Sequence, residues 1–305
     1  MGKIAFVFSG QGAQYPGMGR SLCARSKAAQ AVFSAADALR PGTQAQCFEA
    51  SEAELCETKN TQPCMFTVEL AAAAALEEAG IRADLAAGFS LGELAALTYA
   101  GAMSFGTGFR LVCRRAEHMQ KAAEAASASM AAVLKLSNDE VSALCAQFEA
   151  VYPVNFNCPG QVTVSGRADQ MPAFCAAVKA AGGRAVPLKV RGGFHSPFMN
   201  SAAEAFSADA ADARLQMPAI PVYANRTAQP YGGDLAALLT AQLHSPVLWE
   251  ESVRNMIAAG ADTFLELGPG RTLCGLIAKT DASARVYPAG EAEGLEKILT
   301  EAALC

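Results

Sequence analysis

The sequence predicts an α/β protein in which a small ferredoxin-like domain is inserted into a larger domain. Segments with strand character alternate with segments with helix character along most of the 305 residues, a pattern typical of α/β folds. Within residues 127–195 the order of segments is βαββαβ, which is the order of the ferredoxin-like unit. A G-x-S-x-G motif also separates a short apolar strand from a helix. We therefore predict a discontinuous large domain, residues 1–126 plus 196–305, and a small domain, residues 127–195.

The large domain begins with a β-rich run at Lys3–Ser9, which leads into Gly-Gln-Gly. A helix is expected over Asn60–Ala79, because Pro63 lies near its start and Gly80 follows its end. The other predicted elements of this domain are a buried strand at Leu85–Phe89, helices at Leu91–Ala100 and Phe105–Ala126, and strands near Val222 and at Thr263–Leu267.

The small domain carries clear local signals for helix starts and turns. Ser137-Asn-Asp-Glu140 is a capping box that opens a helix running to about Phe148. Cys158-Pro-Gly160 is a turn signal between two strands. The predicted strands are Met130–Leu136, Val151–Asn157, Gln161–Ser165 and Arg184–Val190, and the second helix is Asp169–Ala181.

Composition excludes several classes of function. Hydrophobic residues make up 52% of the chain and charged residues 17%, which predicts a folded globular protein. The net charge of −5 and the lack of a Lys/Arg run argue against nucleic-acid binding. The apolar run Ile4–Phe8 is too short for a signal sequence or a membrane span, so we expect a cytoplasmic protein with no membrane partner. The ten cysteines include no CxxC pair, so reduced thiols are expected and neither a metal nor another cofactor is.

The motif Gly88-Phe-Ser90-Leu-Gly92 is the strongest chemical signal in the chain. A serine on a sharp turn between a strand and a helix must hold a strained backbone, and flanking glycines allow the chain to pass without Cβ clashes. Such a turn exposes the hydroxyl beside backbone N–H groups at a helix N-terminus, which can stabilise an oxyanion. Ser90 is therefore a candidate nucleophile, although a purely structural glycine-rich turn would show the same pattern.

A serine nucleophile needs a base, and the chain has three histidines. His118 lies inside a predicted helix, where it could simply be solvated, and His244 precedes Ser-Pro at a helix end, a common place for a capping histidine. His195 lies in a loop that two glycines and a proline restrain, and loops often carry catalytic groups. The residue pattern favours His195 as the candidate and leaves the other two open.

Two further features complete the candidate site. The turn Ser9-Gly-Gln-Gly-Ala-Gln14 could contribute backbone N–H groups to an oxyanion hole, but it has neither a P-loop ending nor a full dinucleotide fingerprint. Arg115 lies on the apolar stripe of its predicted helix, between Val112 and Met119. An inward-facing arginine needs an anionic partner, which could be a structural acid or a substrate.

Taken together, these residues resemble the malonyl-CoA:acyl carrier protein transacylases of fatty-acid synthesis and their relatives in polyketide synthases. The resemblance covers nearly the whole chain, because several motifs occur in the family's order. These motifs are Phe8-Ser-Gly-Gln-Gly-Ala-Gln14, Gly88-Phe-Ser-Leu-Gly-Glu-Leu-Ala-Ala-Leu97, Asn155-Phe-Asn-Cys-Pro-Gly-Gln161, Gly193-Phe-His-Ser-Pro197, Gln242-Leu-His-Ser-Pro-Val-Leu-Trp249 and Glu266-Leu-Gly-Pro-Gly270.

The resemblance implies a large hydrolase-like α/β domain with the ferredoxin-like insert, and a transfer of malonyl from coenzyme A to the thiol of acyl carrier protein through an ester on the serine. It implies Ser90 as the nucleophile and His195 as the base. The backbone carbonyl of Gln242 would orient the imidazole in place of the usual acid.

The resemblance also assigns the binding groups. The backbone N–H groups of Gln11 and Leu91 would form the oxyanion hole, Arg115 would bind the malonyl carboxylate, and Asn157 would line the cleft. Coenzyme A thioesters and acyl carrier protein would be the partners.

One departure concerns the residue before the nucleophile. The family usually has histidine there, and this chain has Phe89. Phe194, before His195, is similar to malonyl-selective members. Two other interpretations remain at this point: a serine hydrolase or thioesterase, which would need an acid to support its histidine, and a non-enzymatic subunit that binds carrier protein.

Overall fold

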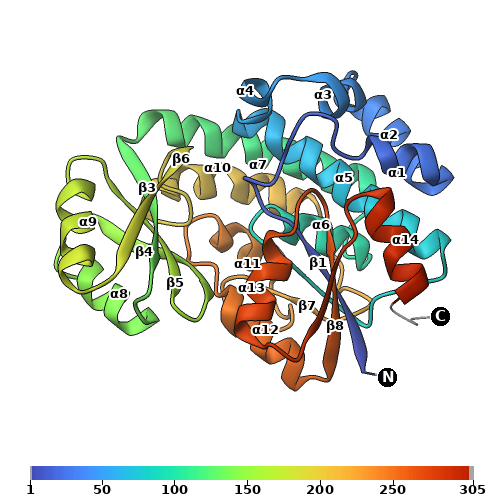
Figure 1. Cartoon of the computed structure of the whole chain (residues 1–305). Helices are drawn as coiled ribbons and strands as arrows, with labels where there is room; N and C mark the ends of the chain where they lie inside the picture. The colour runs from blue at the N-terminus through green and yellow to red at the C-terminus, as the bar shows by residue number, and fades with distance from the viewer. Residues whose placement is uncertain (1, 302–305) are drawn as a thin grey trace.

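The computed structural model describes residues 2–301, apart from the side chains of Lys189 and Arg191. It contains a five-stranded sheet and a four-stranded sheet, which lie on opposite sides of the molecule in Figure 1. The first is parallel and the second antiparallel. The predicted fold class, a mixed α/β protein with a separate ferredoxin-like sheet, is confirmed.

The parallel sheet places three chain turns at one edge. Its order is β7-β2-β1-β8-β9, and Phe8 at the end of β1 is paired with both Gly88 and Leu267, the last residues of β2 and β8. The loops that follow these strands therefore lie together at the carboxyl edge, where open α/β sheets usually bind ligands. The strands are β1 (Lys3–Phe8), β2 (Leu85–Gly88), β7 (Val222–Tyr223), β8 (Ala261–Leu267) and β9 (Arg285–Pro288).

Helices surround this sheet, so its central strands are buried. Residues Ala5–Phe8 of β1 have no exposed surface, as expected when both faces of a parallel sheet are covered. The helices of this part are α1 (Arg20–Arg25), α2 (Lys27–Leu39), α3 (Thr43–Glu49), α4 (Glu52–Leu55), α5 (Thr58–Glu78), α6 (Gly92–Tyr99), α7 (Phe105–Ala125), α10 (Asn200–Asp212), α11 (Leu235–Gln242), α12 (Trp249–Ala258), α13 (Thr272–Thr280) and α14 (Ala292–Glu301), with a 3-10 turn at Pro197–Met199.

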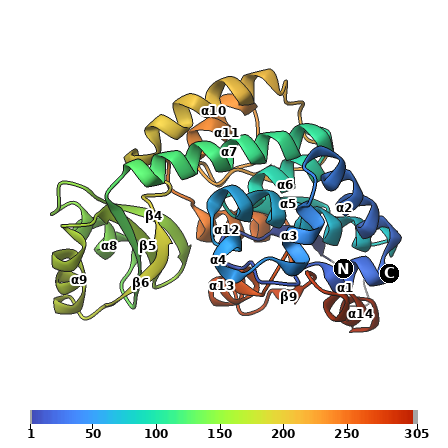
Figure 2. The same cartoon turned by 90° about the horizontal axis from the view of Figure 1, so that it is seen from above.

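Two long helices support the site. α5 is buried over most of its length and packs against α2, α6, α7 and β8. Pro63 lies inside α5, in its second turn, and cannot donate the backbone hydrogen bond that another residue would make there. α7 packs on α5 and α10 and leads directly into the antiparallel sheet, as Figure 2 shows from above.

The antiparallel sheet has the order β4-β5-β3-β6, which is the ferredoxin-like arrangement for a βαββαβ unit. Its two helices cover one face and enclose a separate core that includes Val133, Val164 and Phe174. The predicted capping box is present, since Ser137 accepts from the backbone of Glu140 and the Glu140 side chain accepts from the backbone of Ser137. The elements are β3 (Ala128–Leu134), α8 (Asn138–Cys145), β4 (Val151–Cys158), β5 (Gln161–Arg167), α9 (Met171–Ala180) and β6 (Arg184–Arg191).

The structure adds elements that the sequence patterns did not predict. The four helices between residues 20 and 55 had no prediction, and α8 ends at Cys145 rather than near Phe148. Over the described residues, the helices are too short or too polar to span a membrane.

Candidate active site

Ser90 occupies the turn between β2 and α6, and its neighbours leave no room for anything but glycine. A Cβ on Gly88 would lie 1.9 Å from the carbonyl carbon of Gly92, and one on Gly92 would lie 2.4 Å from the carbonyl oxygen of Phe8. Ser90 itself has a φ of 56°, a left-handed conformation that is uncommon for a residue with a side chain and is typical of functional turns. The strand, the helix and β1 together hold this conformation.

The structure brings His195 to Ser90. The distance from Ser90 Oγ to His195 Nε2 is 2.7 Å, and the distance from His195 Nδ1 to the backbone oxygen of Gln242 is 2.9 Å. Because a carbonyl only accepts, Nδ1 carries the proton and Nε2 is free to accept from the serine hydroxyl. The other two histidines are engaged elsewhere: His118 with Asp209, and His244 with Asn200.

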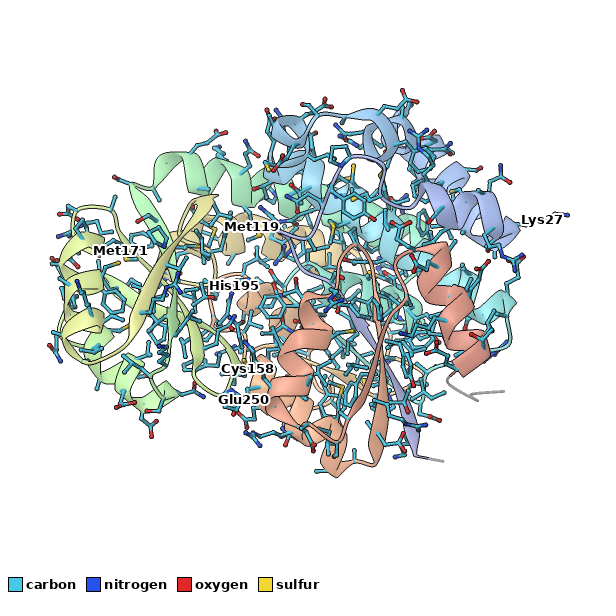
Figure 3. The ribbon with its side chains drawn as sticks, viewed as in Figure 1. Lys27, Met119, Cys158, Met171, His195 and Glu250 are labelled. Carbon is cyan, nitrogen blue, oxygen red and sulfur yellow. The ribbon has the colours of Figure 1, made fainter. Side chains whose placement is uncertain are left out.

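Burial favours the neutral form of His195. Only 4% of the residue is exposed. Desolvation, and after it the positive charge of Arg115, lower the pKa of His195 to about 4, although hydrogen bonds to the backbone at Gln242 and Ser245 oppose this. At neutral pH the imidazole is therefore unprotonated and able to act as a base. Figure 3 shows His195 and Met119 between the two sheets.

Arg115 faces inward, as its position on the helical stripe predicted. The side chain has no exposed surface. Nη1 donates to Gln62 Oε1 at 2.9 Å, and Nη2 donates to Gln242 Oε1 at 2.8 Å and to Ser90 Oγ at 3.2 Å. Burial lowers the pKa of Arg115 to about 10, against the opposing charge of Glu93, so the guanidinium is still charged at neutral pH.

The side chain of Gln242 forms hydrogen bonds with both Arg115 and the buried acid Glu93. Its Nε2 donates to the backbone oxygen of Ser90 at 2.6 Å and to Glu93 Oε2 at 3.1 Å. Glu93 also accepts from the Tyr231 hydroxyl and from the backbone N–H of Asn225. Burial raises the pKa of Glu93 to about 7, although these hydrogen bonds lower it.

Asn225 supports the turn directly. Its Oδ1 accepts from the backbone N–H of Ser90 at 2.7 Å, and its Nδ2 donates to the backbone oxygen of Gly88 at 2.6 Å. In this way one side chain satisfies two backbone groups that the sharp turn would leave unpaired.

The two candidate oxyanion donors have open backbone N–H groups. No described residue accepts a hydrogen bond from the backbone N–H of Gln11 or of Leu91. Leu91 caps the start of α6, and Gln11 lies in the turn after β1, at the same edge of the sheet as Ser90. A Cβ on Gly10 would lie 2.8 Å from the Phe89 ring, so glycine lets this turn approach the nucleophile.

A small cavity of about 100 Å³ opens at Ser90 and His195 between the two sheets. Its other lining residues include Gln11, Gln62, Phe89, Met119, Asn155, Thr163 and Phe194. Asn157 is not among them. It lies behind the wall and donates to the Thr163 hydroxyl at 3.1 Å, so Asn155, rather than the predicted Asn157, lines this cavity.

Sequence patterns did not identify four residues of this site: Gln62, Glu93, Asn225 and Tyr231. Glu93 had a usable signal, because it is the only acid in the apolar helix that follows Ser90. The other three are polar residues with no motif of their own. Over the described residues, no group of three or more His, Cys, Asp or Glu side chains is placed to hold a metal ion.

Comparison with known proteins places this site in a family. The model of the acyl transferase domain matches residues 5–295. The chain therefore belongs to the acyl transferase domain family and is an acyltransferase.

Individual relatives narrow the comparison. The malonyl CoA-acyl carrier protein transacylase of Bacillus subtilis (strain 168) is 37% identical over 97% of this chain and 96% of the relative. The protein of the same name from Escherichia coli (strain K12) is 35% identical over 97% of this chain and 100% of the relative. Among solved structures, a malonyl CoA-acyl carrier protein transacylase from Clostridium perfringens superimposes with a TM-score of 0.95 at 32% identity, over 98% of this chain and 97% of that one. A malonyl-transacylase in complex with a type II PKS acyl-carrier protein gives a TM-score of 0.94 at 31% identity, over 97% of this chain and 99% of the other.

Proposed function

We propose that this acyltransferase moves a malonyl group from malonyl-CoA to the thiol of acyl carrier protein, through a covalent ester on Ser90. The contact between Ser90 Oγ and His195 Nε2 at 2.7 Å, with the Arg115 guanidinium on the same oxygen, is the observation that carries the proposal. The names of the relatives supply the donor and the acceptor. No metal or other cofactor takes part in the reaction as proposed, and a cytoplasmic location remains a prediction.

In the first half-reaction Ser90 Oγ attacks the thioester carbonyl, and its proton moves to His195 Nε2. The carbonyl oxygen becomes an oxyanion that accepts from the N–H groups of Gln11 and Leu91. These groups have no other acceptor among the described residues, so they need no reorganisation. The C–S bond then breaks, and the leaving thiolate of coenzyme A takes the proton from His195. The product is a malonyl ester on Ser90.

In the second half-reaction the thiol of the carrier gives its proton to His195 and its sulfur attacks the ester. The tetrahedral intermediate collapses, the proton returns to Ser90 Oγ, and the malonyl group leaves on the carrier. His195 thus acts as the base in both half-reactions, as expected for a ping-pong mechanism.

The backbone oxygen of Gln242 has a specific part in this scheme. It accepts from His195 Nδ1 and holds the tautomer that the first step needs, which an acid does in many serine hydrolases. A neutral carbonyl stabilises the imidazolium less than a carboxylate does. This arrangement supports the transferase over the hydrolase interpretation, since a hydrolase would be expected to have the acid.

Arg115 supplies the selection for a carboxylated acyl group. Its guanidinium donates to Ser90 Oγ, so an acyl group on that oxygen lies within reach of a charge that has no carboxylate partner among the described residues. A carboxylate can make two parallel hydrogen bonds to a guanidinium.

The proposed function is tested by running the two half-reactions one after the other, with the acyl donor removed before the acceptor is added. The protein is incubated with labelled malonyl-CoA, freed of excess donor, and then given holo acyl carrier protein. We expect label on the protein after the first step and on the carrier after the second. Label that passes to water at the same rate with and without carrier would support a hydrolase instead.

A further inference from the structure

The partners of Arg115 are all neutral, although the residue is fully buried. Its three hydrogen bonds go to the side-chain oxygens of Gln62, Gln242 and Ser90. None of the ion pairs formed by the described residues includes it. A buried arginine is ordinarily paired with an acid, because an uncompensated charge in a dry interior is costly.

The orientation of the Gln62 amide follows from this contact. Gln62 comes from the first turns of α5 and is 1% exposed. A guanidinium only donates, so the amide oxygen must face Arg115 and the amide nitrogen must point away. Among the residues that the structure describes, that nitrogen donates only to the thioether sulfur of Met119, at 3.6 Å, which is a weak acceptor. Gln62 and Met119 both line the cavity at Ser90.

The one nearby acid is held away from Arg115. Glu93 is fully buried, and its oxygens accept from Tyr231, Asn225 and the Nε2 of Gln242. The amide of Gln242 lies between the guanidinium and this carboxyl group, with its oxygen toward Arg115 and its nitrogen toward Glu93. The acid therefore reaches the guanidinium only through a neutral group.

We propose that Gln62 determines specificity: its neutral oxygen holds the Arg115 guanidinium at Ser90 without cancelling the charge, so that the charge is available to an acyl group that carries a carboxylate. An acidic side chain at the same place would hold the guanidinium equally well and would form the ion pair that the substrate should complete. Gln62 acts through Arg115 and is a positioning residue. This inference rests on the proposed function and names the residue that leaves the Arg115 charge free to bind the substrate carboxylate.

The test is Gln62→Glu, which changes the amide to a carboxylate of the same shape. Steady-state kcat and KM are measured with malonyl-CoA and with acetyl-CoA, and the ratio of the two kcat/KM values is compared with that of the unaltered protein. We expect the ratio to fall by roughly thirtyfold or more, the scale on which loss of a buried charge partner weakens binding. The loss should appear mainly as a higher KM for malonyl-CoA, because the acid competes with the substrate carboxylate.

Two further variants separate the effect of a negative charge at position 62 from the effects of added charge elsewhere and of a lost hydrogen bond. Gln147→Glu adds the same charge at an exposed position of the small domain and should leave the ratio unchanged. Gln62→Met keeps the length of the side chain and removes the oxygen without adding charge, so its ratio should lie between those of the unaltered protein and Gln62→Glu. Thermal melting of each variant shows which of them fold.

The outcomes are distinct. If the unaltered protein forms no malonyl ester on Ser90, the proposed function fails. If the ester forms and Gln62→Glu keeps the original ratio, the inference about Gln62 is wrong. Should Gln62→Glu not fold, Gln62→Met decides: an unchanged ratio in that variant overturns the inference, and a lower ratio with a raised KM for malonyl-CoA supports it.

Discussion

Replacing Arg115 with alanine should separate binding of the acyl group from the chemistry at Ser90. The substitution removes a guanidinium that has no contact with solvent and makes three hydrogen bonds of 2.8 to 3.2 Å. The substitution removes one donor to Ser90 Oγ but leaves in place the hydrogen bond between His195 and the backbone of Gln242 and the contact between His195 and Ser90. The proposed loss is therefore in recognition of the malonyl carboxylate.

The magnitude follows from the burial of the site. Removal of one partner of a buried, hydrogen-bonded charge pair costs about 2–5 kcal/mol. At about 1.4 kcal/mol for each factor of ten, kcat/KM for malonyl-CoA should fall by roughly thirtyfold or more. The side-chain oxygens of Gln62 and Gln242 lose a donor as well, and each unpaired buried group lowers the free energy of unfolding by about 1–3 kcal/mol.

The assay measures kcat/KM for malonyl-CoA and acetyl-CoA on Arg115→Ala and Arg115→Lys, with thermal melting to confirm that each variant folds. Acetyl-CoA has no carboxylate, so its slow reaction should be unchanged or faster. Arg115→Lys should recover only part of the loss, because an ammonium is a point charge and cannot make the two parallel bonds. If the rates for both substrates fall by the same factor in a folded variant, Arg115 is a structural residue and the reasoning is refuted.

Three other predictions concern protonation and packing. The kcat/KM for acylation should stay level as the pH falls to about 5 and then decline toward the lowered pKa of His195, since only the neutral imidazole accepts a proton; a decline centred near the ordinary value of 6.5 would contradict the burial argument. Glu69 is fully buried, neither of its carboxyl oxygens has a hydrogen-bond partner within the described part of the chain, and burial raises its pKa well above the ordinary 4.5. At a pH between the ordinary pKa and the raised pKa of the folded state, Glu69 is protonated in the folded state and ionised in the unfolded state. The free energy of unfolding therefore falls as pH rises, by about 1.4 kcal/mol per pH unit for one such group. Glu69→Gln should therefore raise the melting temperature more at pH 8 than at pH 5, and an equal shift at both would show that Glu69 is ionised when folded. Phe89 packs edge-on against Trp249 with ring centroids 5.5 Å apart, and Phe89→His should keep or raise the acylation rate, because histidine adds a polar atom at the cavity wall; loss of activity would mean that the site is packed around the phenyl ring.

The parts of the fold that the sequence predicted are those with local signals. The capping box at Ser137, the turn at Cys158-Pro-Gly160 and the glycines around Ser90 each act over a few residues, and each specifies an element boundary. The inward direction of Arg115 followed from helical spacing alone. The short helices between residues 20 and 55 could not be predicted in this way, because α1, α3 and α4 are each seven residues or fewer and depend on packing against α5 and α2.

The contacts within the site needed the tertiary structure. Ser90 and His195 are 105 positions apart, Arg115 and Gln242 are 127 apart, and Glu93 and Tyr231 are 138 apart. No periodicity links residues at such separations, so the sequence could supply candidates for nucleophile and base but not their partners. The choice between an acid and a substrate as the partner of Arg115 was open for the same reason, and it is the amides of Gln62 and Gln242 that occupy those positions.

The role of Ser90 as the acyl carrier can be tested by intact-mass and peptide mass spectrometry after brief incubation with malonyl-CoA in the absence of carrier protein. We expect one malonyl group per chain, located on the peptide that contains Ser90. The adduct should persist until holo acyl carrier protein is added, and it should be absent from Ser90→Ala. A malonyl group on another residue, or the same adduct on Ser90→Ala, would contradict the central claim that Ser90 carries the acyl group between its donor and its acceptor.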